Sequence, residues 1–286
     1  MLLRALVDIS STVGVISKGS KFYELNPTQA GEMIKLGQAE SLEPEIKADT
    51  SVVVKPQEPL AAPVRIGPNS RGWDGLLWDG ATVVVIGSGP SLTIEQTQAV
   101  RDWRWGGDTV ATDRKVIVIN TSFRLAPWAD VLYACDSVWW NAKEPGSKTT
   151  YYEEALTLFN KDSLWTQDRG AANELGLRYV QSVNARGLSK KPGVIHQGNN
   201  SGYQAVNLAY IAGAKRIILL GFDMRGSHWH GDHPPPLSST LPHITWINNF
   251  SPLARELKDA GIEVLNATPK SALKYFPMVT LDEVLK

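Results

Sequence analysis

The chain has 286 residues, 43% of them hydrophobic, and its 29 basic and 29 acidic residues give a formal net charge of zero. This length and apolar content allow a large buried core, in one large domain or in one large and one small domain. Because Lys and Arg form no run or stripe, we expect no nucleic-acid partner. The single cysteine, Cys135, excludes an internal disulfide and is typical of a reducing cytoplasm, so we expect a cytoplasmic protein.

The first residues, MLLRALVDISS, interrupt their apolar stretch with Arg4 and Asp8. No later segment reaches the roughly 18 consecutive apolar residues that a membrane-spanning helix needs. We therefore expect neither a signal peptide nor a membrane partner.

Residues 1–43 are expected to form a small α+β module. Segments 2–9 and 21–25 are typical of strands, and Asn26-Pro27 predicts a helix start, with a helix end near Gly37. The module holds no His or Cys, so we interpret it as a docking or packing module. Residues 44–71 contain five prolines and little periodicity, which predicts a linker.

From residue 72 to 286, short apolar runs alternate with helical segments. The runs are rich in β-branched residues, as in strands buried on both faces of a parallel sheet, and they cover 81–86, 115–119, 131–134, 216–221 and 262–265. Residues 201–212 predict a helix that ends at Gly213, and PLARELKDAG (252–261) predicts a last helix. This alternation indicates a doubly wound, mainly parallel α/β sheet.

Small or hydrogen-bonding residues follow every predicted strand, at the edge where such folds bind ligands. They are Gly87-Ser88-Gly89-Pro90-Ser91, Asn120-Thr121-Ser122, Asp136-Ser137, Gln197 to Gly202 with Asn199, Asp223, and Asn266 to Ser271. In GSGPSL the backbone N–H groups can face an anion, although a tight strand-to-helix turn explains the glycines as well. Leu92 replaces the third glycine of a dinucleotide motif, and the Lys of a P-loop is absent.

GSGPSL, the dipeptide Ile119-Asn120 and NSGYQAVNLAYIAGAKRIILLGFDM together resemble the bacterial sialyltransferases of the Campylobacter type. They are equally similar to the related family of unknown function that includes the archaeal hydroxymethylpterin pyrophosphokinase. The resemblance covers about residues 80–275. It implies a Rossmann-like, sialyltransferase-like domain whose nucleotide contacts are Gly87, Ser88, Gly89, Pro90, Ser91, Asn120, Ser201, Gly202 and Asp223.

The closing segment NATPKSAL is also similar to that of the family and adds Ser271 to the nucleotide contacts, as the crevice adds Asn199. The sialyltransferases have Asn where Ser88 stands, and they place a catalytic His shortly before the last helix. His243 lies within about one position of that register and is a candidate base. The whole chain is similar, too, to uncharacterised proteins of tailed phages, which makes a phage structural protein a candidate partner of residues 1–43.

HWHGDH, residues 228–233, resembles the metal motif of the metallo-β-lactamase superfamily. That fold needs further metal ligands, whereas the 53 residues after His233 contain one His, so we exclude a dinuclear hydrolase. Two interpretations stay open. The loop forms the rim of the site with its histidines facing substrate, or His228, His230 and His233 hold one transition metal.

The favoured function is a nucleotide-dependent transferase, specifically a glycosyltransferase with a nucleotide-sugar donor. The base is His243, His230 or His233, and Asp136 positions a substrate unless it only caps a turn. Trp139-Trp140 forms a sugar platform or packs in the core. No cofactor is implied, and a divalent metal is left open. The alternatives are a non-enzymatic virion or morphogenesis protein that retains the fold, and an enzyme that transfers diphosphate.

Overall fold

A computed structural model of the chain describes residues 75–106, 110–232, 237 and 242–286, together with short segments before residue 42. The chain divides into two compact units, Met1–Arg65 and Ile66–Lys286. The predicted linker at 44–71, nearly all of the predicted helix at 26–37, and His233 lie outside the described residues.

The first unit contains two small antiparallel sheets. In one of them β1 (Leu2–Ala5) pairs with both β4 (Lys21–Tyr23) and β5 (Ala39–Ser41). In the other, β2 (Ile9–Ser11) pairs with β3 (Gly14–Ile16). The two strand-like segments predicted here correspond to β1 and β4.

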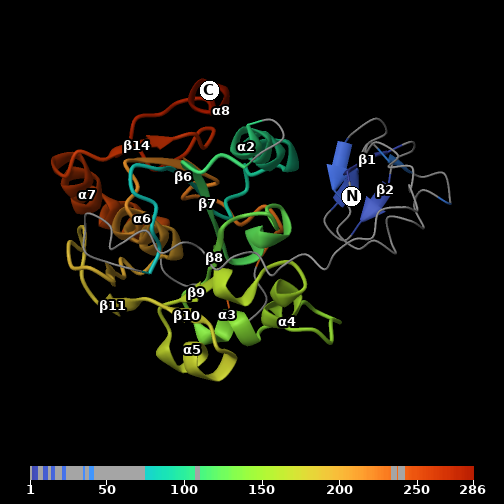
Figure 1. The fold of residues 1–286 in the computed structure, drawn as a ribbon, viewed down its shortest axis with the longest axis horizontal. Coiled ribbons are helices and arrows are strands. Elements are labelled where there is room, and N and C mark those ends of the chain that lie inside the picture. Colours follow the sequence, from blue (N-terminus) through green and yellow to red (C-terminus); the bar gives the residue numbers. More distant parts are fainter. Residues whose placement is uncertain are drawn as a thin grey trace, which may run out of the picture. The chain divides into compact units, whose positions relative to one another are not determined.

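The second unit is built on a seven-stranded sheet in which all neighbouring strands are parallel (Figure 1). Along the sheet the order is β10 (Arg178–Tyr179), β9 (Leu164–Thr166), β8 (Val131–Tyr133), β7 (Arg114–Ile119), β6 (Thr82–Ile86), β13 (Arg216–Leu220) and β14 (Glu263–Asn266). β11 (Gln181–Val183) and β12 (Val194–His196) form a separate parallel pair. The predicted doubly wound α/β fold is confirmed, and the five predicted strands agree with the observed ones to within one residue.

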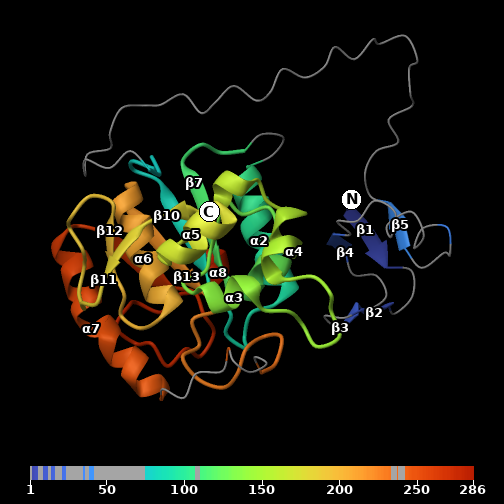
Figure 2. The ribbon, with the colours of Figure 1, turned by 90° about the horizontal axis from the view of Figure 1, so that it is seen from below.

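Helices cover both faces of this sheet (Figure 2). Side chains alternate along each strand, so Val83 and Val85 pack in one core cluster and Val84 and Ile86 in the other. On the first face lie α6 (Ser201–Ala212) and α7 (His243–Asp259). On the second lie α2 (Ile94–Trp105), α3 (Ser137–Asn141), α4 (Tyr151–Leu156), α5 (Arg169–Leu175) and α8 (Leu281–Val284). No helix in the described part of the chain is long and apolar enough to span a membrane.

α6 is buried from Gly202 to Ala212, which explains its many small side chains. Asn200 caps its first turn by accepting the Tyr203 N–H at 3.1 Å, and Gly213 ends it with a left-handed φ of 115°. The predicted helix at 201–212 is therefore confirmed at both ends.

α7 begins at His243, nine residues earlier than the predicted helix start at Pro252. A proline inside a helix lacks the N–H that would donate to the carbonyl oxygen four residues earlier. For Pro252 that oxygen belongs to Asn248. Asn248 is exposed, so water can take that place and the helix continues through Pro252. As a consequence, His243 stands in the first turn of the helix and not in a preceding loop.

The first strand in the large unit, β6, lies in the interior of the sheet, with β7 on one side and β13 on the other. From β6 the chain passes through α2 on one face of the sheet to β7, and it later returns through α6 on the other face to β13. The strands that follow β6 in sequence, β7 to β10, thus extend to one side of it, and β13 and β14 lie on its other side. In open α/β sheets this reversal of the strand order leaves a crevice beyond the carboxyl ends of the strands.

Candidate functional site

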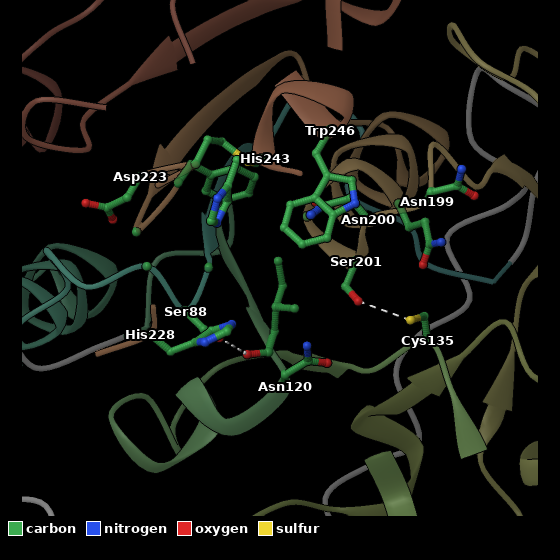
Figure 3. A pocket seen from close by; sticks show the side chains of 18 of the residues that line it. Ser88, Asn120, Cys135, Asn199, Asn200, Ser201, Asp223, His228, His243 and Trp246 are labelled. Atoms are coloured by element: carbon green, nitrogen blue, oxygen red, sulfur yellow. Dashed lines mark hydrogen bonds between the residues drawn. The ribbon is translucent and has the colours of Figure 1, made fainter. Parts of the chain in front are cut away.

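A cavity of about 810 Å³ opens at this reversal, beyond the carboxyl ends of β6, β7, β8, β9 and β13 (Figure 3). Its remaining walls are the start of α6, the loop after β13 and the start of α7. The strand ends that the sequence predicted to form a crevice therefore meet around one space.

The cavity brings together most of the predicted site residues. Its lining contains Gly87, Ser88, Gly89, Asn120, Asp136, Asn199, Ser201, Gly202, Asp223 and His243. It also contains Asp232 of the HWHGDH segment, and Gln167, Arg225 and Trp246, which the sequence analysis did not single out. The described residues Pro90, Ser91, His230 and Ser271 are not part of the lining.

Gly87 and Gly89 let the turn after β6 pack directly on the turn after β13. A Cβ atom on Gly87 would lie 2.7 Å from the Gly221 oxygen, and one on Gly89 would lie 2.0 Å from Asp223 Oδ2. The Gly87 and Gly89 amides donate to the Leu220 and Gly221 carbonyl oxygens at 2.7 and 2.8 Å. These two amides hold the turns together and are not free to bind an anion.

Ser91 and Ser271 fix the loop after β13. Ser91 donates its hydroxyl proton to Asp223 Oδ2 at 2.9 Å, and the Ser271 hydroxyl donates to the Phe222 carbonyl oxygen. Burial raises the pKa of Asp223 above its usual value, and the hydrogen bonds from Ser91 act in the opposite direction. Both serines thus support the wall of the cavity from behind.

The start of α6 is the part of the lining best suited to an anion. Asn200 occupies two amides of the first turn, since its side chain accepts from Tyr203 and its carbonyl oxygen accepts from Gln204 at 3.1 Å. The amides of Ser201 and Gly202 have no acceptor within the helix, as in the first turn of any α-helix. Both residues line the cavity, and the positive end of the helix dipole points toward it.

Backbone strain concentrates at the cavity. Of the four described non-glycine residues with positive φ, three line it: Asn120 at 50°, Asn199 at 55° and Met224 at 52°. A left-handed non-glycine residue costs of order 1 kcal/mol or more, and such residues cluster at functional sites. Asn tolerates this region better than most side chains, which explains the residue type at two of these positions.

Three polar side-chain atoms of the lining are buried and have no hydrogen-bond partner within the described structure. They are Asn120 Oδ1 after β7, Gln167 Oε1 after β9 and Trp246 Nε1 on α7. A buried polar group without a partner costs about 1–3 kcal/mol. Two acceptors and one donor, on residues from three different walls of the cavity, therefore lack a partner among the described residues.

Asp136, His228 and His243 are among the lining residues suited to proton transfer. His243 lies in the first turn of α7, and Asp136 is exposed at the end of β8. Asp136 Oδ2 accepts the Cys135 thiol proton at 2.9 Å, and Cys135 Sγ accepts the Ser201 hydroxyl proton at 3.1 Å. Burial and the neighbouring Asp136 raise the pKa of Cys135 far above its usual value, so the thiol stays protonated.

The loop that begins HWHGD is held by its tryptophan. The Trp229 amide donates to the Ser88 carbonyl oxygen at 3.1 Å, and the indole N–H donates to Ser122 Oγ at 3.0 Å. His228 lines the cavity and stacks on His230 with ring centroids 5.2 Å apart. The loop thus forms the rim, while the metal set predicted from His228, His230 and His233 stays a prediction because His233 lies outside the described residues.

His230 faces a group of ion pairs behind the rim. Arg124 bridges Glu144 and Glu154, with nitrogen–oxygen distances of 2.7 and 2.6 Å. Burial alone would raise the pKa of Glu144, but its hydrogen bond and ion pair with Arg124 outweigh burial, and an electrostatic contribution from His230 adds to the lowering. A role of His230 as the base stays a prediction.

Trp139 and Trp140 belong to the core. Their exposed fractions are 4% and 0%, and their indole N–H groups donate to Thr121 Oγ1 and to the Ala134 carbonyl oxygen. Core packing, one of the two predicted roles, is therefore the one they have. The tryptophan at the cavity is Trp246, which a helix start at His243 would have suggested, since the two residues lie one turn apart.

No protein-family profile matches the chain, and no curated protein matches it. Among solved structures, the fold is similar to that of the sialyltransferase CstII from Campylobacter jejuni, studied in complex with the substrate analogue cytidine-5'-monophosphate. The sequence identity is 14% and the TM-score 0.41, and the match covers 71% of this chain and 86% of that chain.

Proposed function

We propose that the cavity binds a nucleotide and that the chain is a nucleotide-dependent transferase, specifically a glycosyltransferase with a nucleotide-sugar donor. The observation that carries the proposal is the set of three unpartnered polar atoms, on Asn120, Gln167 and Trp246, around one cavity. A volume of about 810 Å³ falls in the range of small-molecule sites, about 300–1,000 Å³. Such a space accommodates a ligand of nucleotide-sugar size.

Each part of the lining has a distinct role in this proposal. The amides of Ser201 and Gly202 bind a phosphate at the start of α6, where the helix dipole favours negative charge. The amide side chain of Asn120 hydrogen bonds to the nucleoside. His243 removes the proton from the acceptor hydroxyl as the new glycosidic bond forms and the nucleotide leaves with the electrons of the old one.

The described lining carries more negative than positive side chains, which affects how the phosphates of a ligand would bind. In the described lining three carboxylates, Asp136, Asp223 and Asp232, stand against one permanently charged cation, Arg225. No cluster of three His, Cys, Asp or Glu side chains in the described residues is arranged to hold a metal ion. A divalent cation would therefore enter with the phosphates of the ligand.

The surplus of carboxylates favours a second candidate, the transfer of diphosphate from a nucleoside triphosphate. Such an enzyme needs Mg²⁺ on the phosphates, and carboxylates are the side chains that suit this ion. Asp232, from the HWHGDH segment, adds a third acidic group to Asp136 and Asp223.

The proposal is tested by measuring the turnover of candidate substrates. Purified protein is incubated, with and without Mg²⁺, with a panel of nucleotide sugars and nucleoside triphosphates, and the released nucleotides are separated by chromatography. We expect a nucleotide sugar to release its nucleotide, and we expect His243→Asn to slow the release about 100-fold or more, the usual loss of a general base. Release of AMP from ATP would favour diphosphate transfer instead.

The matched control is His196→Asn. His196 lies at the end of β12, its Nδ1 is 3.0 Å from the Arg186 carbonyl oxygen, and it is not part of the lining. This variant should release nucleotide at the wild-type rate. If the wild-type chain releases nothing and binds no ligand of the panel, the transferase proposal is wrong, and a protein that keeps the fold without a reaction becomes the better account.

A further inference from the structure

Trp246 combines three properties that no other tryptophan in the described part of the chain combines. Its side chain lines the cavity, its Nε1 is buried, and that nitrogen has no hydrogen-bond partner among the described residues. In Figure 3 its indole lies across the middle of the view, between His243 on one side and Asn200 and Ser201 on the other. The residue therefore places an aromatic ring at the wall of the cavity and carries a donor that no described residue uses.

The indole is held on a rigid element. α7 packs into the core through Phe250, Leu253 and Leu257, which are fully buried. Asn249 ties the helix to the loop before α6 by donating to the Gly198 carbonyl oxygen at 2.8 Å. The ring of His243 contacts the Trp246 ring edge to face, with centroids 5.3 Å apart.

An aromatic face that is held in a fixed position favours ligands that contain a ring. Stacking on an indole favours a flat π-system or the apolar face of a sugar, and the N–H, which lies in the plane of the indole, needs an acceptor beyond the edge of the stacked ring. The wall beside the indole consists of neutral hydrogen-bonding groups, Asn199, Asn200 and Ser201 (Figure 3). That wall can bind the edge of a polar ring but offers no second aromatic face.

We propose that Trp246 is the specificity-determining residue of the cavity, which stacks on a ring of the ligand and donates its indole N–H to an acceptor on another part of the ligand, beyond the edge of that ring. The inference rests on the proposed function, because the rings in question are the base and the sugar of a nucleotide sugar. Trp246 selects the ligand, while His243 acts on it.

The experiment compares Trp246→Leu and Trp246→Phe with the wild type by isothermal titration calorimetry. Leu removes the aromatic face and the donor, whereas Phe keeps a face and removes the donor. The ligands are a nucleotide sugar bound by the wild type, its nucleoside monophosphate, and ribose 5-phosphate, which has neither base nor second sugar. Trp105→Leu is the matched control, since Trp105 contacts Trp128 edge to face, with ring centroids 6.0 Å apart, and does not line the cavity.

We expect Trp246→Leu to weaken binding about 5- to 150-fold, the range for removing one stacked aromatic ring. A loss shared by the monophosphate and the nucleotide sugar identifies the base as the stacked ring, and a loss confined to the nucleotide sugar identifies the sugar. Trp246→Phe should weaken binding less, about 2- to 12-fold, the usual effect of one neutral hydrogen bond. Ribose 5-phosphate and Trp105→Leu should show no change.

Equal affinities of the wild type and Trp246→Leu for every ligand would overturn the inference and leave the proposed function intact. Wild-type affinity in Trp246→Phe would show that the indole N–H is not used and would overturn the donor part. If the wild type binds no nucleotide at all, the proposed function fails first and the inference fails with it. Circular dichroism on each variant establishes that it is folded, and Trp246→Phe tests the site even if the Leu variant is not.

Discussion

Gly89→Ala should destabilise the large unit, because the turn after β6 leaves no room for a side chain. The added Cβ atom would lie 2.0 Å from Asp223 Oδ2 and 2.7 Å from the Gly221 carbonyl oxygen. The second contact is with backbone that continues directly from β13. The substitution must therefore push β6 and β13 apart at their carboxyl ends or displace the Asp223 carboxylate from Ser91.

Two losses set the expected magnitude. Overpacking by one methyl group costs about 1–3 kcal/mol. A displaced Asp223 would also lose the hydrogen bond from Ser91, and hydrogen bonds to charged groups contribute about 1.5–3 kcal/mol. We expect the free energy of unfolding to fall by roughly 1–6 kcal/mol, least if only the backbone moves and most if the carboxylate is displaced as well.

Urea denaturation followed by circular dichroism measures this change. The control is Gly170→Ala in α5, where φ is also not positive and the nearest atom to the added Cβ is the side-chain Oδ1 of Asp168, at 3.1 Å. That variant should stay within about 1 kcal/mol of the wild type, since Ala favours a helix more than Gly does. If Gly89→Ala loses less than about 1 kcal/mol, packing does not explain the glycine.

Asp223→Asn tests the buried carboxylate through pH. Burial raises the pKa of Asp223 in the folded chain, so its contribution to stability is full below the unfolded pKa and is lost as pH rises through the folded pKa. The melting temperature of Asp223→Asn relative to wild type should therefore increase as pH rises above about 3.9, and a constant difference would contradict the pKa direction. Trp229→Phe loses the hydrogen bond to Ser122, so amide exchange in residues 225–232 should accelerate, and unchanged exchange would show that the indole does not anchor the rim. A shortened chain that begins at Ser70 should fold and melt cooperatively, whereas an insoluble or molten product would show that residues 1–69 contribute to the core of the large unit.

The sequence allowed the fold to be predicted where the local pattern was long enough to be unambiguous. VVVI in β6 and RIILL in β13 are continuous apolar runs, which only a strand buried on both faces or a buried helix accommodates. β9 is only Leu-Trp-Thr and β10 only Arg-Tyr, too short for any periodicity, and neither was predicted. Because β9 was missed, Gln167 at its carboxyl end was missed as well.

The candidate site was predictable in location but not in detail. Parallel strands bring their carboxyl ends to one edge, so Asn120, Asp136 and Asp223 could be expected to meet. Which groups are free to bind is decided by long-range contacts, such as the Gly89 amide with the Gly221 oxygen, that no local pattern contains. The position of Trp246 could not be predicted either, because it depends on the start of α7 at His243, whereas Pro252 led to a predicted start nine residues later.

The most direct test of nucleotide binding is the ligand-induced shift in melting temperature of the wild type, Asn120→Gly and Lys270→Gly. Asn120 and Lys270 both have a left-handed φ, 50° and 51°, which glycine adopts without strain, but only Asn120 lines the cavity. A ligand at a hundredfold excess over its dissociation constant stabilises the wild type by about 2.7 kcal/mol, or roughly 5–11 °C for a unit of this size. We predict that the best nucleotide or nucleotide sugar of the panel gives this shift in the wild type and in Lys270→Gly, and less than half of it in Asn120→Gly. No shift in the wild type, or the same shift in all three proteins, would contradict the assignment of the cavity as a nucleotide site.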